Sequence, residues 1–114
     1  MIKTRTAGAI AILEVHGSLT ASDGDSGLRK AVRAALDGGA RTVILNLTDV
    51  PAVDSSGVAQ LASGHLTSAN HGARLKLCCL SQKLKDVFVI TRLNSVFDAY
   101  DTEEDAIASA KTIG

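Results

Sequence analysis

The chain has 114 residues with 12 basic and 12 acidic side chains, so its formal net charge is zero at pH 7. This length predicts a single domain over residues 1–114, and a hydrophobic content of 46% argues for one apolar core and against disorder. A neutral chain without basic runs is not expected to bind nucleic acid directly or to hold a membrane surface. Since no apolar stretch approaches the about 20 residues of a membrane-spanning helix, we expect no membrane insertion.

The two cysteines, Cys78 and Cys79, are adjacent in the sequence. On a strand their side chains point to opposite faces, and a disulfide between neighbours needs strained geometry. We therefore expect reduced thiols and a cytoplasmic protein. The histidines His16, His65 and His71 lack metal-ligand spacing, so we expect no metal. Neither the Walker nor the dinucleotide glycine spacing occurs, so we expect no cofactor.

Hydrophobic patterning divides the first half of the chain into two strands, a helix and a third strand. The predicted helix begins after Ser26 as N-cap and ends at Gly38-Gly39, since serine caps helices and glycine terminates them. The elements are a strand over Ile2–Arg5, a turn at Ala7-Gly8, a strand over Ala9–His16, a loop over Gly17–Gly27, a helix carrying Leu28, Ala31, Val32, Ala35 and Leu36, and a strand over Thr42–Leu47.

The second half continues the alternation of helices and strands. Capping residues open each predicted helix: Asp54-Ser55-Ser56 for the first, Ser81 for the second, and a capping box at Thr102 and Asp105 for the third. The elements are a helix to about Asn70 with Val58, Leu61, Ala62, His65 and Ala69 on one face, a strand over Arg74–Leu80, a helix over Gln82–Arg92, a strand over Phe97–Tyr100, and a helix over Thr102–Lys111.

The predicted fold class is therefore α/β. The order of elements indicates a mixed, mainly parallel sheet with an N-terminal β-hairpin and about four helices packed against it. Functional loops of such sheets lie at the carboxyl ends of the strands. The segment after Leu47 follows one of these ends.

That segment opens its helix with Asp54, Ser55 and Ser56. A helix N-terminus presents unpaired N–H groups and the positive end of the helix dipole, so it stabilises an anion. A phosphate on a serine there would gain hydrogen bonds and add about 1.5 to 2 negative charges to the surface. Capping alone also explains these residues, and the two roles are compatible.

The run Asp54-Ser55-Ser56-Gly57-Val58-Ala59-Gln60-Leu61 resembles the signature of the anti-sigma factor antagonists, a bacterial family of STAS domains. The usual family form is Asp-Ser-Ser/Thr-Gly-Leu-Gly, so Val58-Ala59 replaces Leu-Gly. Gly17-Ser18-Leu19-Thr20 lies where the family carries Gly-x-Leu-Asp, with Thr20 in place of the acid. The strand of Arg74–Leu80 and the helix after it also fit the family layout, so the similarity spans essentially the whole chain.

The resemblance implies a phosphorylation switch without enzymatic activity of its own. In this family the first serine after the aspartate, here Ser55, is phosphorylated by an anti-sigma factor that is also a serine kinase. The unphosphorylated antagonist binds the anti-sigma factor and frees the sigma factor, while phosphate blocks binding and a serine phosphatase restores it. The partner-binding residues are then expected to be Thr20, Asp23, Asp54, Ser55, Ser56 and Gly57, with the segment from Thr20 to Ser26 as an adjoining contact loop.

Other functions compete with this interpretation. A STAS domain also serves as a subunit of other assemblies, such as a lipid-transport complex, a stress-signalling scaffold or a transporter accessory. A receiver domain would use Asp54 as its phosphate acceptor, but the acidic pair that receivers carry after their first strand is missing. A hydrolase would need a base near Ser55 or Ser56, and the Gly-x-Ser-x-Gly elbow is absent.

Overall fold

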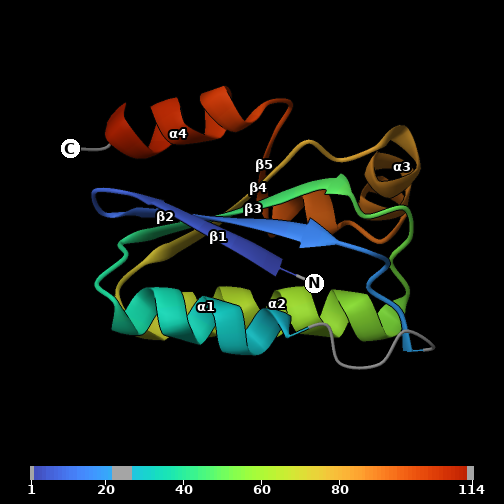
Figure 1. Cartoon of the computed structure of the whole chain (residues 1–114). Coiled ribbons are helices and arrows are strands. Elements are labelled where there is room, and N and C mark those ends of the chain that lie inside the picture. The colour runs from blue at the N-terminus through green and yellow to red at the C-terminus, as the bar shows by residue number, and fades with distance from the viewer. Residues whose placement is uncertain (1, 22–26, 113–114) are drawn as a thin grey trace.

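The computed structural model describes residues 2–21 and 27–112 of the chain. Within these residues five strands form one sheet in the order β1-β2-β3-β4-β5, accompanied by four α-helices (Figure 1). The α/β class and the order of elements predicted from the sequence are therefore confirmed. The elements are β1 (Ile2–Ala7), β2 (Ile10–His16), α1 (Leu28–Asp37), β3 (Thr42–Asp49), α2 (Ser55–Asn70), β4 (Arg74–Cys78), α3 (Gln82–Ile90), the short 3-10 helix η2 (Leu93–Ser95), β5 (Asp98–Tyr100) and α4 (Glu103–Thr112).

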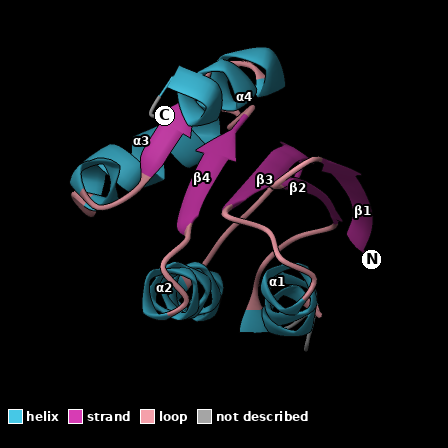
Figure 2. Ribbon diagram, turned by 90° about the vertical axis from the view of Figure 1, so that its left-hand side faces the viewer, coloured by secondary structure: helices cyan, strands magenta, loops and turns pink. Residues whose placement is uncertain are grey.

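The sheet is mixed. β1 and β2 form an antiparallel hairpin, whereas β2, β3, β4 and β5 are parallel to one another. Helices α1 and α2 lie side by side against one face, α4 lies over the opposite face, and α3 lies near the β5 edge (Figures 1 and 2). The parallel strands bring the loops that follow β2 and β3 to the same edge of the sheet.

Apolar residues cover both faces of the sheet, because alternate residues of a strand point to opposite sides. On β3, Val43, Leu45 and Leu47 belong to the larger buried cluster, together with residues of α1 and α2. Ile44 belongs to a smaller cluster with Cys78 of β4 and Ala106 of α4. Burial on both sides explains the nearly continuous apolar run of this strand. None of the helices in the described part of the chain combines the length and apolarity needed to cross a bilayer.

The hairpin turn and the start of α1 each lie one residue later than predicted, and a glycine with a positive φ angle occupies each position. The hairpin turn lies at Gly8-Ala9, one residue later than predicted, with φ +62° at Gly8. The residue before α1 is Gly27, with φ +78° and no side-chain capping hydrogen bond. The prediction of Ser26 as N-cap is therefore wrong, and Ser26 itself lies outside the described residues.

One prediction about side-chain direction is wrong, and a second, the α2 face, holds for Leu61 but not for its alanines. β4 ends at Cys78, and Cys79 and Cys78 both pack in the smaller cluster instead of facing opposite sides. On α2, Ala62 and Ala69 are exposed. The helix instead buries a narrower set of mostly small residues: Gly57, Leu61, Gly64 and Ser68.

Candidate functional site

The loop between β3 and α2 is joined to the segment that follows β2. The Leu19 N–H donates to the Ala52 carbonyl at 2.9 Å, and the Asp54 N–H donates to the Leu19 carbonyl at 3.2 Å. Leu19 and Val53 thereby form a parallel bridge, with Leu19 only 1% exposed. The two loops therefore form one backbone-paired unit at the carboxyl edge of the sheet.

Asp54 is the N-cap of α2, as the sequence predicts, and it also bridges the two loops. Its Oδ1 accepts the Gly57 N–H at 3.1 Å, and its Oδ2 accepts the Ala21 N–H at 3.0 Å. The N–H groups of Ala21 and Gly57 lower the pKa of the Asp54 carboxyl below its ordinary value. The side chain is therefore ionised at neutral pH, and each oxygen has a separate structural partner.

Gly57 lies in the first turn of α2, where the helix touches the Leu19 backbone. A Cβ at this position would overlap the Leu19 carbonyl oxygen and lie 2.8 Å from both Leu19 Cβ and Val53 Cγ1. Only glycine fits this approach without a shift of the backbone. Gly57 is buried, so its effect on the predicted partner-binding surface is indirect: it lets α2 lie close to Leu19.

Ser55 and Ser56 are the first two residues of α2. Ser55 is exposed and Ser56 is half-buried, so Ser55 is the more accessible of the two residues. Thr20 is half-buried and comes directly before Ala21, whose N–H binds Asp54. The structure thus brings Thr20, Asp54, Ser55, Ser56 and Gly57 together at this edge, whereas Asp23 lies outside the described residues.

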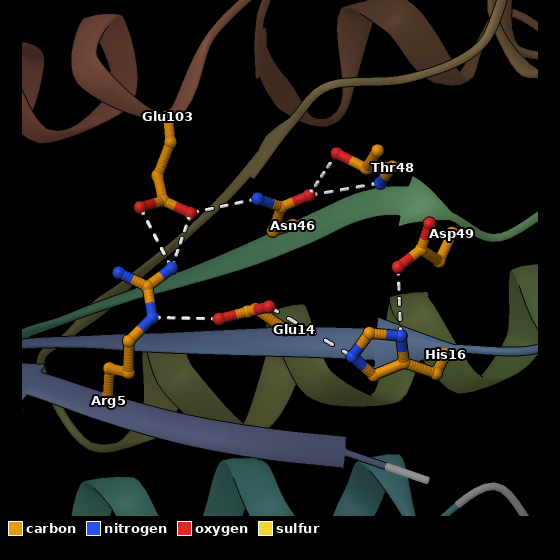
Figure 3. A network of polar contacts seen from close by, with 7 residues as sticks. All are labelled: Arg5, Glu14, His16, Asn46, Thr48, Asp49 and Glu103. Atoms are coloured by element: carbon orange, nitrogen blue, oxygen red, sulfur yellow. Dashed lines mark hydrogen bonds and ion pairs between the residues drawn. The ribbon is translucent and has the colours of Figure 1, made fainter.

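A second polar cluster lies at the same end of the sheet, on the side of α4 (Figure 3). Glu103, at the start of α4, accepts hydrogen bonds from Arg5 Nη2 at 2.8 and 2.9 Å and from Asn46 Nδ2 at 2.8 Å. No local sequence pattern indicates this cluster, since Arg5 and Glu103 lie 98 residues apart. It ties α4 to β1 and β3.

Asp49 is the last residue of β3 and, unlike Asp54, does not cap a helix. Its Oδ2 is 2.9 Å from Nδ1 of His16, at the end of β2, and its carbonyl accepts the Gly17 N–H at 3.1 Å. Asp49 therefore fixes the exit of β2 toward the segment that carries Leu19. In residues 2–21 and 27–112, no three His, Cys, Asp or Glu side chains form a group that could hold a metal ion.

A family model of the STAS domain matches residues 1–106. The chain belongs to the STAS family. The family resemblance read from the Asp-Ser-Ser-Gly segment is thus confirmed. A comparison with curated proteins gives no significant match.

Several solved structures have the same fold. An anti-sigma factor antagonist from Mycobacterium paratuberculosis has a TM-score of 0.83 at 16% identity, over 97% of this chain and 93% of that chain. The unphosphorylated anti-sigma factor antagonist SpoIIAA of Bacillus has a TM-score of 0.72 at 21% identity, over 97% of this chain and 98% of that chain. A sulfate transporter family protein from Wolinella succinogenes has a TM-score of 0.77 at 20% identity, over 95% of this chain and 89% of that chain.

Within this STAS domain, the sequence predicted the Asp54 cap but not its two backbone partners, Leu19 and Ala21. Leu19 and Ala21 act through main-chain groups, which leave no side-chain signature. The only sequence signal for this contact was the likeness of Gly17-Ser18-Leu19-Thr20 to a family motif. The steric reason for Gly57 became visible only with Leu19 in place.

Proposed function

We propose that this STAS domain is an anti-sigma factor antagonist controlled by phosphorylation of Ser55. The unphosphorylated form binds an anti-sigma factor that is also a serine kinase, and a sigma factor is released. Phosphorylation at Ser55 blocks this binding, and a serine phosphatase restores it. The domain acts by binding in the cytoplasm and catalyses no reaction itself.

The observation that carries the proposal is the exposed residue Ser55 at the first position of α2, directly after the capping Asp54. Asp54 already places a negative charge at this helix start. A phosphate beside it would add about 1.5 to 2 further charges and three acceptor oxygens to the surface. Added charge and bulk at the centre of a docking surface disfavour association. SpoIIAA, which shares the fold, has been solved in both an unphosphorylated and a phosphorylated form.

Partner capture from native cytosol tests the proposal. Wild-type protein, Ser55→Ala and Ser55→Asp are used in parallel, with Ser56→Ala as the matched control in the same helix turn. We expect an ATP-binding serine kinase to be retained by wild type, Ser55→Ala and Ser56→Ala and lost by Ser55→Asp. In the presence of ATP, the captured kinase should label wild type and Ser56→Ala but not Ser55→Ala. Full labelling of Ser55→Ala would show that Ser55 is not the acceptor.

A second candidate function is that of a STAS subunit in another assembly, such as a lipid-transport complex, a stress-signalling scaffold or a transporter accessory. The similarity to the Wolinella succinogenes transporter-family structure favours the transporter version of this alternative. Its signature in the same experiment is the retention of transporter or scaffold subunits equally by wild type and Ser55→Asp. Ser55 would then have only a structural role in the first turn of α2.

A further inference from the structure

The two cysteine thiols lie on the same side of the sheet although their residues are adjacent. Cys78 is the last residue of β4 and is fully buried, and Cys79 is partly exposed. Both belong to the smaller apolar cluster between the sheet and α4, with Tyr100, Ala106 and Ile107. Regular alternation along a strand would have separated them.

The backbone of Cys79 causes this arrangement. Its φ is +63°, a left-handed conformation that is uncommon for a residue other than glycine, asparagine or aspartate. The Cys79 N–H donates to the Tyr100 carbonyl at 3.1 Å, which holds the bend against β5. Among the described residues Arg92 also has this conformation without being glycine. Arg92, however, follows the end of α3, where left-handed residues commonly terminate helices, whereas Cys79 follows a strand.

The pair offers two sulfurs with different access. Burial raises the pKa of the Cys78 thiol, and a hydrogen bond with the Cys79 side chain raises it further. Because Cys79 is partly exposed and Cys78 is buried, an incoming reagent meets the Cys79 thiol first. Cys78 then supplies the second sulfur. This order converts the second bond-forming step into an intramolecular one.

The two sulfurs suit a bridging ligand better than a direct disulfide. Adjacent Cα atoms are about 3.8 Å apart across a trans peptide, whereas an ordinary disulfide joins Cα atoms about 4.4 to 6.8 Å apart. Structural zinc takes four protein ligands. In the part of the chain that the structure describes, no third His, Cys, Asp or Glu completes such a group. The donor set is thus a pair of thiols.

We propose that Cys78 and Cys79 form a two-thiol site for a thiophilic ligand that takes two sulfurs, of the class of organic trivalent arsenicals. With an organoarsenic oxide, two sulfur–arsenic bonds form and the arsenic–oxygen bond breaks. The oxygen leaves as water with the two thiol protons, and nothing is oxidised or reduced. The site lies under α4, on the opposite side of the sheet from α1 and α2, and is independent of the Ser55 proposal.

The test uses the full chain, reduced, with phenylarsine oxide as the probe. Intact mass is measured in excess 2-mercaptoethanol and again after dithiothreitol. We expect one arsenical per wild-type chain with loss of one water, resistant to the monothiol and removed by the dithiol. Release by the monothiol would overturn the proposal, because it would show a bond to a single sulfur.

Variants show whether both sulfurs are required. Cys79→Ala and Cys78→Ala should each lose the monothiol-resistant adduct completely, while each still accepts one iodoacetamide after unfolding. Because Cys78→Ala leaves a cavity in a buried cluster, Cys79→Gly is added, since glycine suits the left-handed backbone at this position. A resistant adduct in any of these variants contradicts the proposal.

Two adjacent cysteines could bind the arsenical in the unfolded chain as well. Thermal unfolding shows whether the folded chain binds it more tightly. A ligand that prefers the folded chain raises Tm. We therefore expect the arsenical to raise Tm of wild type and to leave Tm of Cys79→Gly unchanged. An unchanged or lower Tm of wild type would mean that the unfolded chain binds at least as well, and the site as proposed would be wrong.

Discussion

At the scale of single residues, the two glycines of α2 show how closely the site is packed. Gly57 and Gly64 are both buried on the same helix. A Cβ at Gly57 would overlap the Leu19 backbone, whereas a Cβ at Gly64 would lie 3.7 Å from Leu75 Cδ2 and Val32 Cγ2, an ordinary contact. One glycine is therefore required by a neighbouring chain segment, and the other has room for a methyl group.

We predict opposite effects of alanine at these two positions. Gly57→Ala should lower the free energy of unfolding by about 1 to 3 kcal/mol, the usual cost of overpacking, since the neighbour is backbone and has little freedom to move. Gly64→Ala should raise it by roughly 0.5 to 1 kcal/mol, because alanine favours the helix. Urea denaturation of both variants measures the difference. Equal effects would show that helix propensity alone, and not the contact with Leu19, governs Gly57.

The same residues show which parts of the site were predictable. Asp54 was predicted as N-cap because capping depends on a few neighbouring residues and leaves a local signature. The second hydrogen bond of Asp54, to the Ala21 N–H, joins residues 33 positions apart. It depends on the path of a loop and on a main-chain donor, and neither is encoded in residue type.

At the scale of elements, α2 shows why hydrophobic periodicity did not predict the buried face of a helix correctly. Periodicity predicted a face that includes Ala62, His65 and Ala69, but Ala62 and Ala69 are exposed. The helix turns small residues, Gly57, Gly64 and Ser68, toward the rest of the protein. Small residues permit closer approach to the sheet, so the buried face of such a helix is not its most hydrophobic one. Hydrophobic periodicity has no means of ranking glycine and serine as core residues.

Helix α4 is held by its first turn as well as by its apolar face. The Glu103 carboxylate receives Arg5 and Asn46 (Figure 3). Burial raises the pKa of Glu103, but the hydrogen bonds from Asn46 and Arg5 outweigh this and lower it overall. The carboxylate is therefore charged at neutral pH, and its contribution to stability is lost as the pH falls through this lowered pKa.

We expect Glu103→Gln to loosen α4 locally. The Arg5 and Glu103 side chains are 50% and 22% exposed, and solvent screens a pair of this kind. The substitution should accelerate amide hydrogen exchange in α4 roughly two- to fivefold, which corresponds to about 0.5 to 1 kcal/mol. Glu104→Gln is the control, because it removes the same charge from the same helix turn at an exposed position. Equal acceleration in both variants would assign the effect to the helix dipole rather than to the contact with Arg5.

At the scale of the whole molecule, the topology was predictable because it follows from the order of elements. Strands that alternate with helices pair in parallel with short connections, and the observed sheet order is sequential. The hydrogen bonds between α4 and the sheet were not predictable, because Arg5 and Glu103 are 98 positions apart in the sequence. Local patterns thus located the strands and helices, while long-range contacts determined which helix faces and which loop residues came together.

The two apolar clusters share their central strand, which has a consequence for unfolding. Leu45 and Ile44 of β3 belong to different clusters but are covalent neighbours. Because β3 contributes residues to both clusters, the loss of one cluster also disrupts the strand that the other needs. We therefore expect both clusters to unfold in one transition. Tyr100, the single tyrosine in a chain without tryptophan, packs against the smaller cluster and reports on it by fluorescence. Its urea transition should coincide with that of far-UV circular dichroism, which reports on all helices and strands. A Tyr100 transition at lower urea would show instead that β5 and α4 separate from the sheet as an independent unit.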